Sequence, residues 1–251
     1  LGVLPFVLYR FLLDTIGVEL LGVWSVVLST STISRIGELG LSASAVKFVA
    51  KYVAREDMET AADALQTAVL TVATVLGLGL LLVYPVARWI LGMVIPSEQL
   101  GAAFSILPYA LLSLFLAAVT GVYQSGLEGC QRIDVRGAIL IGGAVLHLLL
   151  CFVLTPAYGL MGLAYARVIQ TVVALFVTWW LTRATMKEIP LVPYRWSRRL
   201  FREMVGYGVN FHVATLMRMI YEPTTTALLS RFGGLSTVAY YEMANRMVRQ
   251  I

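Results

Sequence analysis

The feature that most constrains this chain is a series of apolar runs, each close to the length that crosses a lipid bilayer. A hydrocarbon core about 30 Å thick is spanned by about 20 helical residues. Such runs cover residues 1–13, 20–49, 65–95, 100–127, 137–154, 160–181 and 205–229, and another begins near Ser236. Because the bilayer offers no water to unpaired backbone groups, each run is predicted to be a helix. The sequence therefore predicts an all-α integral membrane protein with about eight transmembrane helices.

Composition excludes an ordinary soluble domain. The chain is 59% hydrophobic and only 13% charged, whereas soluble domains are about 45–50% apolar and about 25% charged. Cys130 and Cys151 lie in apolar surroundings and have neither the number nor the spacing of a disulfide framework or a zinc site. We therefore expect no metal and no cofactor. Because the chain begins and ends inside apolar runs, we also expect it to be a fragment of a longer protein.

Lysine and arginine are unevenly divided between the two sets of alternating loops. One set holds ten such residues, which are Lys51, Arg55, Arg132, Arg136, Arg183, Lys187, Arg195, Arg198, Arg199 and Arg202. The other set holds only Arg88 and Arg231. Basic loops face the cytoplasm in most membrane proteins. The net charge of +5 is thus explained by topology, and no nucleic-acid partner is expected.

Two short stretches match each other far apart in the sequence. LLDTIGVELLGVW (12–24) and LLSRFGGLSTVAYY (228–241) both place a glycine and then an aromatic residue at an outer turn. An even number of predicted spans separates them, so both point the same way across the membrane, as in a parallel repeat. We therefore predict a six-helix first bundle over residues 1–186 and the start of a second over 205–251.

Residues 187–204 form the predicted linker between the two bundles. Two prolines end the sixth span, and a basic amphipathic stretch follows them. Trp196, Leu200 and Met204 are spaced four residues apart and so share one helical face. We expect this stretch to be a helix in the cytoplasmic headgroup layer of the membrane.

Charged residues inside the second predicted span form a candidate site. Ser31, Arg35, Glu38 and Ser42 lie on one helical stripe, with Arg35 near the middle of the membrane. A charge at that depth is costly and suggests a functional role, here the lining of a polar cavity. The alternative is a local Arg35–Glu38 ion pair that is only structural.

The sixth and seventh predicted spans carry three more charged candidates. Arg218 lies near the middle of the seventh span, with Glu222 one turn later and Pro223 next to it. A proline there favours a kink, although a self-neutralised ion pair remains the alternative. Arg167 has no acidic residue within four positions. Its partner is therefore another helix, water or an anionic substrate.

Two stretches resemble bacterial polysaccharide flippases. YGVNFHVATLMRMIYEPTTTALLSRFGGLSTVAYYEMANRMVRQI (207–251) is similar to their seventh and eighth helices. ELGLSASAVKFVAKYVAREDMETAADALQTA (38–68) is similar to their second helix and first cytoplasmic loop. The resemblance is to the O-antigen type of transporter in the multidrug/oligosaccharidyl-lipid/polysaccharide exporter superfamily. It implies two helical bundles in the inner membrane of a bacterium.

The resemblance also implies a substrate, an oligosaccharide carried on a polyprenyl diphosphate and turned from the inner to the outer leaflet. A bare diphosphate in hydrocarbon would cost tens of kcal/mol by an idealised estimate. The head therefore needs a wet, cationic cavity while the polyprenyl tail stays in lipid. We expect the cavity to be lined by Arg35, Glu38, Arg167, Arg218 and Glu222, with a proton or sodium ion as possible coupling ion.

Two other functions are alternatives to the flippase. A multidrug antiporter of the same superfamily would export organic cations and would need acidic cavity residues, but the deep charges here are arginines at least as often as carboxylates. A membrane glycosyltransferase would need a catalytic domain, whereas every loop except the basic linker is short. The sequence thus predicts a transporter rather than an enzyme.

Overall fold

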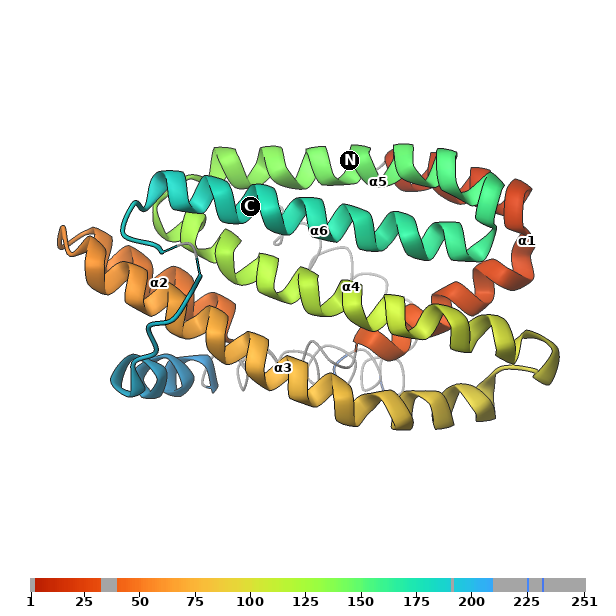
Figure 1. Cartoon of the computed structure of the whole chain (residues 1–251), viewed down its shortest axis with the longest axis horizontal. Helices are drawn as coiled ribbons and strands as arrows, with labels where there is room; N and C mark the ends of the chain where they lie inside the picture. Colours follow the sequence, from red (N-terminus) through yellow and green to blue (C-terminus); the bar gives the residue numbers. More distant parts are fainter. Residues whose placement is uncertain (1–2, 33–39, 191, 210–224, 226–231, 233–251) are drawn as a thin grey trace.

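A computed structural model describes residues 3–32, 40–190 and 192–209, together with Thr225 and Phe232. Within these ranges the regular structure is entirely helical, as predicted. The helices are α1 (Val3–Thr32), α2 (Leu41–Val53), α3 (Met58–Val94), α4 (Ser97–Gly129), α5 (Ile133–Tyr158) and α6 (Leu160–Thr185), and a further helix covers 198–209. Helices α3, α4, α5 and α6 run side by side along the long axis of one bundle (Figure 1).

Helices α3 to α6 correspond to the third to sixth predicted spans, and the structure extends each of them. In the described part of the chain, five helical segments are long and apolar enough to cross a membrane. The longest, α3, has 37 residues, which is roughly 55 Å at 1.5 Å per residue. Because the hydrocarbon core is only about 30 Å thick, the ends of α3 project beyond it. The chain is a multi-pass membrane protein.

Helix α1 is broken at Gly17, which is where the sequence predicts the turn between the first two spans. Gly17 has φ 81° and ψ 167°, a conformation that glycine adopts without the strain of a Cβ atom. The candidate span Arg10–Leu28 straddles this break, so it is not one straight helix. The part of α1 after Gly17 covers the start of the predicted second span, 20–49, and α2 covers its end.

Part of the second predicted span and most of the second bundle lie outside the described residues. The part of the second span is residues 33–39, and the second copy of the repeat at 228–241 is outside except for Phe232. The count of eight spans and the parallel repeat therefore remain predictions.

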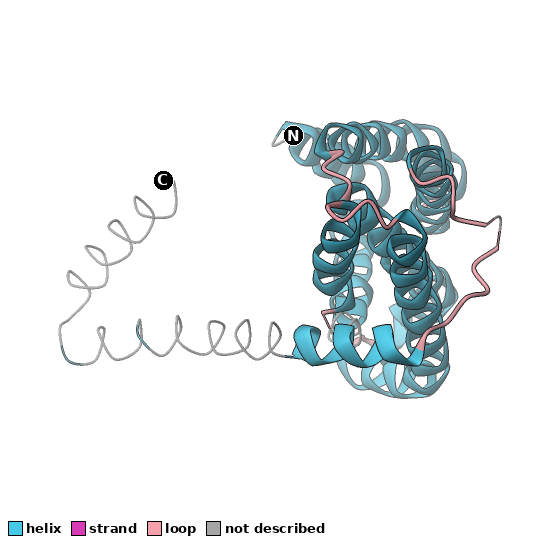
Figure 2. Ribbon diagram, turned by 90° about the vertical axis from the view of Figure 1, so that its left-hand side faces the viewer, coloured by secondary structure: helices cyan, strands magenta, loops and turns pink. Residues whose placement is uncertain are grey.

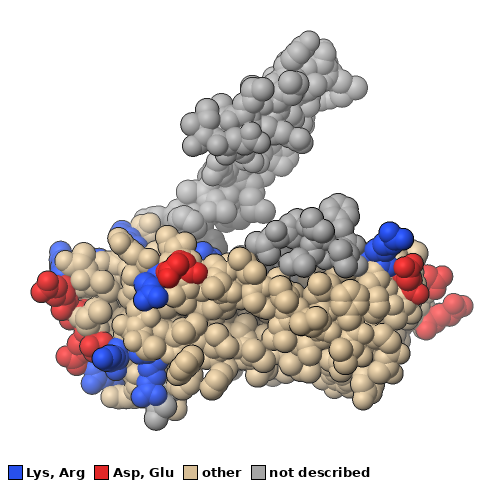
Figure 3. Space-filling model, turned by 90° about the horizontal axis from the view of Figure 1, so that it is seen from above, with Lys and Arg blue, Asp and Glu red and all other residues tan. Residues whose placement is uncertain are grey.

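The connections alternate between the two ends of the bundle, as the loop analysis predicts. The α2–α3 turn, the α4–α5 turn and the segment that follows α6 lie at one end, and the α3–α4 and α5–α6 turns lie at the other (Figure 1). On the face drawn in Figure 3, the Lys, Arg, Asp and Glu side chains of the described residues gather toward these two ends, and the surface between them carries other residues. We refer to the first end as the basic-loop end. Its cytoplasmic location remains a prediction.

Helix α3 begins at the basic-loop end with a side-chain cap. Asp57 precedes it, and its carboxylate accepts a hydrogen bond of 3.0 Å from the backbone N–H of Thr60. Such a bond satisfies one of the unpaired donors at a helix start. It also lowers the pKa of Asp57. The cap fixes the point at which the chain turns back from α2 into the bundle.

The interior consists of two apolar clusters arranged along the bundle, with α4 in contact with all five other helices. One cluster joins α2, the first half of α3 and the second half of α4. The other joins α1, the second half of α3, the first half of α4 and the start of α6. At the α5–α6 turn, a Cβ on Gly162 would lie 2.9 Å from Thr155 Cα. Only glycine permits that approach.

The linker after α6 is held against α3. Residues 194–197 donate four hydrogen bonds of 3.2–3.4 Å to side chains of α3, at Gln66, Thr67 and Thr71. In Figure 2 the linker runs along the outside of the bundle and leads into the helix over 198–209. These hydrogen bonds fix the linker to about one and a half turns of α3.

Arg195 adds an ion pair to this attachment. Its Nη1 atom lies 2.8 Å from Glu59 Oε1 and 3.5 Å from Asp63 Oδ1. The hydrogen bond to Glu59 raises the pKa of Arg195 above its ordinary value, so the guanidinium stays charged at any physiological pH.

Two of the three apolar residues of the amphipathic stretch pack against protein. Leu200 and Met204 are buried in the cluster that α2 and α3 share, and Ser44 Oγ donates a hydrogen bond of 2.8 Å to the Met204 carbonyl. Trp196 precedes the helix, which begins at residue 198, and is half exposed. The location of the stretch in the headgroup layer remains a prediction.

Candidate functional site

A polar cavity of about 680 Å³ lies among α1, α2, α4, α5 and α6. Helix α4 supplies most of its wall. The α4 lining residues recur every three or four positions and so lie on one face, and they are Ala110, Ser113, Leu114, Ala117, Ala118, Gly121, Gln124, Ser125 and Glu128. Most of these side chains are small. The cavity exists because this face of α4 does not fill the space between its neighbours.

The hydroxyl groups on this face bond back to their own helix. Ser125 Oγ donates to the Gly121 carbonyl at 2.9 Å, and Ser113 Oγ donates to the Ala110 carbonyl at 2.8 Å. Each hydroxyl oxygen keeps free lone pairs. Gln124 also lines the cavity, and its amide has no hydrogen-bond partner among the described residues. The wall therefore offers both donors and acceptors to a polar solute.

Arg167 of α6 lines this cavity, but its described partner lies on its own helix, whereas the sequence predicts a partner outside it. Its side chain is half-buried, and its Nη1 donates a hydrogen bond of 3.1 Å to Gln170 Oε1 on the same helix. In the part of the chain that the structure describes, no carboxylate lies within ion-pair distance of it. Its positive charge is therefore available to an anion in the cavity.

Arg136 and Glu128 also line the cavity, and sequence reasoning missed both as site residues. Arg136 lies in the first turn of α5 and forms an ion pair with Glu128 near the end of α4. Arg136 Nε is buried and has no hydrogen-bond partner among the described residues. The signal in the sequence is the small-residue face of α4, which ends at Glu128. Two arginines and one glutamate leave this described lining with one net positive charge.

The other predicted site residues lie outside the described ranges. These are Arg35, Glu38, Arg218 and Glu222. Ser42, which ends the predicted stripe containing Arg35 and Glu38, does line the cavity. The structure thus brings together Ser42 and Arg167 from distant parts of the sequence.

The arrangement is suited to binding an anion. Guanidinium groups form strong, often bidentate, hydrogen bonds to phosphate oxygens, and hydroxyl and amide groups match sugar hydroxyls. Among the described residues, no group of three or more His, Cys, Asp or Glu side chains is placed to hold a metal ion. The cavity is therefore a candidate site for an anionic, hydroxyl-rich solute.

Comparison with known families assigns the chain. The whole sequence, residues 1–251, matches the family described as polysaccharide biosynthesis protein. The chain belongs to this family. A search of curated proteins found no match to the sequence.

Solved transporters share the fold of this family member. A Vibrio cholerae MATE transporter superposes with a TM-score of 0.73 at 18% identity, over 97% of this chain and 56% of that one. An outward-facing multidrug resistance MATE family transporter of the MOP superfamily gives 0.70 at 20% identity, over 99% and 57%.

A third similar structure is a MOP superfamily transporter from Pyrococcus furiosus. Its TM-score is 0.66 at 19% identity, over 98% of this chain and 57% of that one, and its binding pocket is described as having reverse polarity, suggesting a different function. At these identities the similarity shows the fold. The chain spans little more than half the length of these transporters.

Proposed function

We propose that this chain forms the first bundle of a transporter that flips a polyprenyl-diphosphate-linked oligosaccharide from the inner to the outer leaflet by alternating access. The observation that carries the proposal is Arg167, an arginine on a polar cavity with no acidic partner among the described residues. The family supports a role in polysaccharide biosynthesis, and the fold supports transport.

The substrate explains why a cavity of this kind lies inside an apolar bundle. Moving the diphosphate into hydrocarbon would cost tens of kcal/mol by an idealised estimate, and the sugars would lose their hydrogen bonds to water. Arg167 supplies an unneutralised positive charge for the diphosphate. Arg136 supplies a buried Nε donor at the end of the cavity near the basic loops.

The remaining predicted residues extend this site in the proposal. Arg35 and Glu38 would continue the wall that Ser42 begins, and Arg218 with Glu222 would face it from the second bundle. The basic-loop end would face the cytoplasm of a bacterium, where the substrate enters. The proposal leaves open whether a proton or a sodium ion drives the cycle.

The alternative is a multidrug antiporter, and the similar MATE structures are the observation that favours it. An exported organic cation would need an unneutralised carboxylate in the cavity. The acid in the described lining, Glu128, is already paired with Arg136. The charge of this wall therefore favours an anionic substrate.

The deciding experiment is complementation with the complete protein. In a strain that lacks its polysaccharide flippase, we expect surface polysaccharide to return and lipid-linked oligosaccharide to stop accumulating on the cytoplasmic side. In a strain that lacks its drug exporters, we expect no gain of resistance to cationic drugs. Drug resistance without restored polysaccharide would establish the antiporter instead.

A further inference from the structure

A second, apolar groove lies on the opposite side of α4 from the polar cavity. Its volume is about 440 Å³, and α3, α4, α6 and the linker line it. Its lining includes Val69, Ala73, Phe115, Val119, Tyr123 and Trp179. Phe176, which lines the groove, is a large apolar side chain that is 62% exposed. Such a surface in a membrane protein is in contact with lipid tails.

The groove belongs to one leaflet. Helix α4 lines it from Phe115 to Tyr123, a rise of roughly 12 Å at 1.5 Å per residue. This is less than half of the hydrocarbon core, which is about 30 Å thick. Trp179, six residues before the end of α6, and Pro193 in the linker line the groove on the side of the basic loops. A lipid tail in the groove would therefore come from the leaflet at that end.

The guanidinium of Arg183 lies where the headgroup of such a lipid would be. Arg183 is one turn beyond Trp179 on α6, and its Cζ atom lies 5.9 Å from the centroid of the Trp179 ring. Tryptophan is enriched at the membrane interface, and arginine extends from there into the headgroups. Within the described ranges, Arg183 has no carboxylate at ion-pair distance. Its charge is therefore not neutralised by the described protein.

Tyr123 adds a polar group to the groove wall. The residue is only 5% exposed, and its hydroxyl has no hydrogen-bond partner among the described residues. That hydroxyl is therefore free to donate a hydrogen bond to an oxygen atom of a bound lipid.

The geometry of α4 separates this groove from the polar cavity. Phe115, Val119 and Tyr123 face the groove, whereas Ala117 and Gly121 face the cavity. Positions two apart on a helix point in nearly opposite directions, because each residue turns the helix by about 100°. A substrate whose diphosphate lies in the cavity could not also place its tail in this groove. The occupant is therefore a separate lipid.

We propose that the groove between α3, α4 and α6 binds an acyl chain of an anionic phospholipid, whose headgroup phosphate contacts Arg183. Anionic phospholipids are enriched in the cytoplasmic leaflet and are attracted to basic residues near its surface. The charge of Arg183 selects their headgroups. The groove and Tyr123 hold the chain and the adjoining oxygen atoms.

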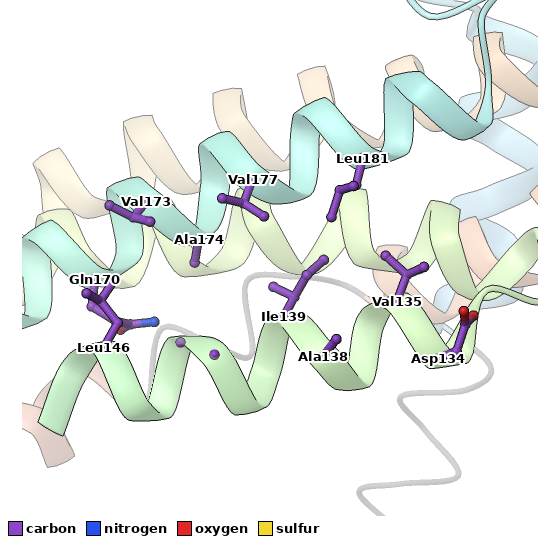
Figure 4. Close-up of a pocket in the computed structure, with 12 residues that line it drawn as sticks. Asp134, Val135, Ala138, Ile139, Leu146, Gln170, Val173, Ala174, Val177 and Leu181 are labelled. Atoms are coloured by element: carbon purple, nitrogen blue, oxygen red, sulfur yellow. The ribbon is translucent and has the colours of Figure 1, made fainter. Parts of the chain in front are cut away.

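Another apolar groove on the same bundle, which we call the control groove, provides a matched control. It lies between α5 and α6, is also apolar, and has the same volume of about 440 Å³. Figure 4 shows it with Asp134 at the end near the basic loops and Ala174 in its wall. The Asp134 carboxylate forms an ion pair with Arg132 Nε at 3.3 Å, so the arginine at this end is already neutralised and no selectivity for an anionic headgroup is expected there.

The test is native mass spectrometry of the complete protein with phosphatidylglycerol and phosphatidylcholine that carry identical chains. We expect a retained phosphatidylglycerol molecule in preference to phosphatidylcholine. Arg183→Gln should lower that preference roughly fivefold, which is the effect of one arginine near an anionic surface. Ala73→Leu, which narrows the groove, should lower retention of both lipids.

Matched variants make the result decisive. Arg55→Gln removes an exposed charge in the α2–α3 turn, and Ala174→Leu narrows the control groove; neither should change retention. An equal effect of Arg55→Gln and Arg183→Gln would overturn the proposal, as would an equal effect of Ala174→Leu and Ala73→Leu. So would preferential capture of a polyprenyl phosphate in the groove. The readout is independent of transport, so its failure leaves the proposed function standing.

Discussion

Replacing Arg167 is the sharpest test of the polar cavity, because the described structure gives this side chain no acid to strand. Its one described side-chain hydrogen bond, 3.1 Å to Gln170, is within the same helix. Loss of a hydrogen bond from a charged group costs about 1.5–3 kcal/mol, but removal of Arg167 also removes the cost of holding its charge at membrane depth. Arg167→Ala should therefore insert in the membrane at nearly normal abundance.

Transport by Arg167→Ala should fall much further than its abundance. A hydrogen bond to a charged group contributes about 1.5–3 kcal/mol. At about 1.4 kcal/mol for each factor of ten, loss of the contact with the diphosphate predicts roughly a tenfold to hundredfold decrease. Arg167→Lys should keep part of the activity, because the charge survives while the bidentate geometry is lost.

The matched control is Gln170→Ala, which removes the same hydrogen bond and leaves the charge of Arg167 in place. The assay is lipid-linked oligosaccharide that reaches the periplasm, normalised to the amount of transporter in the membrane. Normal transport by Arg167→Ala would refute the role of this charge. An equal loss in Gln170→Ala would show that the hydrogen bond, rather than the charge, is what matters.

Three further predictions follow from the fold. Impermeant thiol reagents should not label intact cells that carry single cysteines at the basic-loop end, introduced at Asp57, Arg132 or Trp196; labelling from outside would reverse the orientation. Gln66→Ala should lower stability by about 1–3 kcal/mol and speed proteolysis of the linker, because the acceptor for residues 194 and 195 is lost; unchanged melting and proteolysis would contradict this. Gly162→Ala should cost about 1–3 kcal/mol through overpacking, whereas Gly142→Ala, which faces open space, should not destabilise; equal melting temperatures for both variants would count against the α5–α6 contact.

Hydropathy predicts α3 to α6 because lipid and the interior of the bundle both favour apolar side chains along the whole of a spanning helix. The length of an apolar run then follows from the thickness of the bilayer. The turn at Gly17 was equally accessible, since a glycine flanked by two apolar runs marks a place where the backbone can leave the helical region. Arg167 stood out for a related reason, because a deep charge without a local acid is costly and therefore marks a candidate functional site.

The linker shows where this reasoning stops. An amphipathic pattern predicts that the side chains of Leu200 and Met204 are removed from water, but it does not predict whether lipid or protein covers them. Lipid headgroups and a protein groove both remove an apolar face from water. The choice depends on the hydrogen bonds that α3 offers to residues 194–197, and those acceptors lie more than a hundred positions away in the sequence.

Arg136 shows a second limit, because two interpretations of one residue turned out to be compatible. Counted with the loops, it supports the orientation of the bundle. In the structure it lies in the first turn of α5, lines the cavity and pairs with Glu128 across the α4–α5 turn. The cavity reaches the basic-loop end of the bundle, so a residue near a loop can serve both topology and binding. Loop charges at that end should therefore be tested as cavity residues before they are assigned to orientation alone.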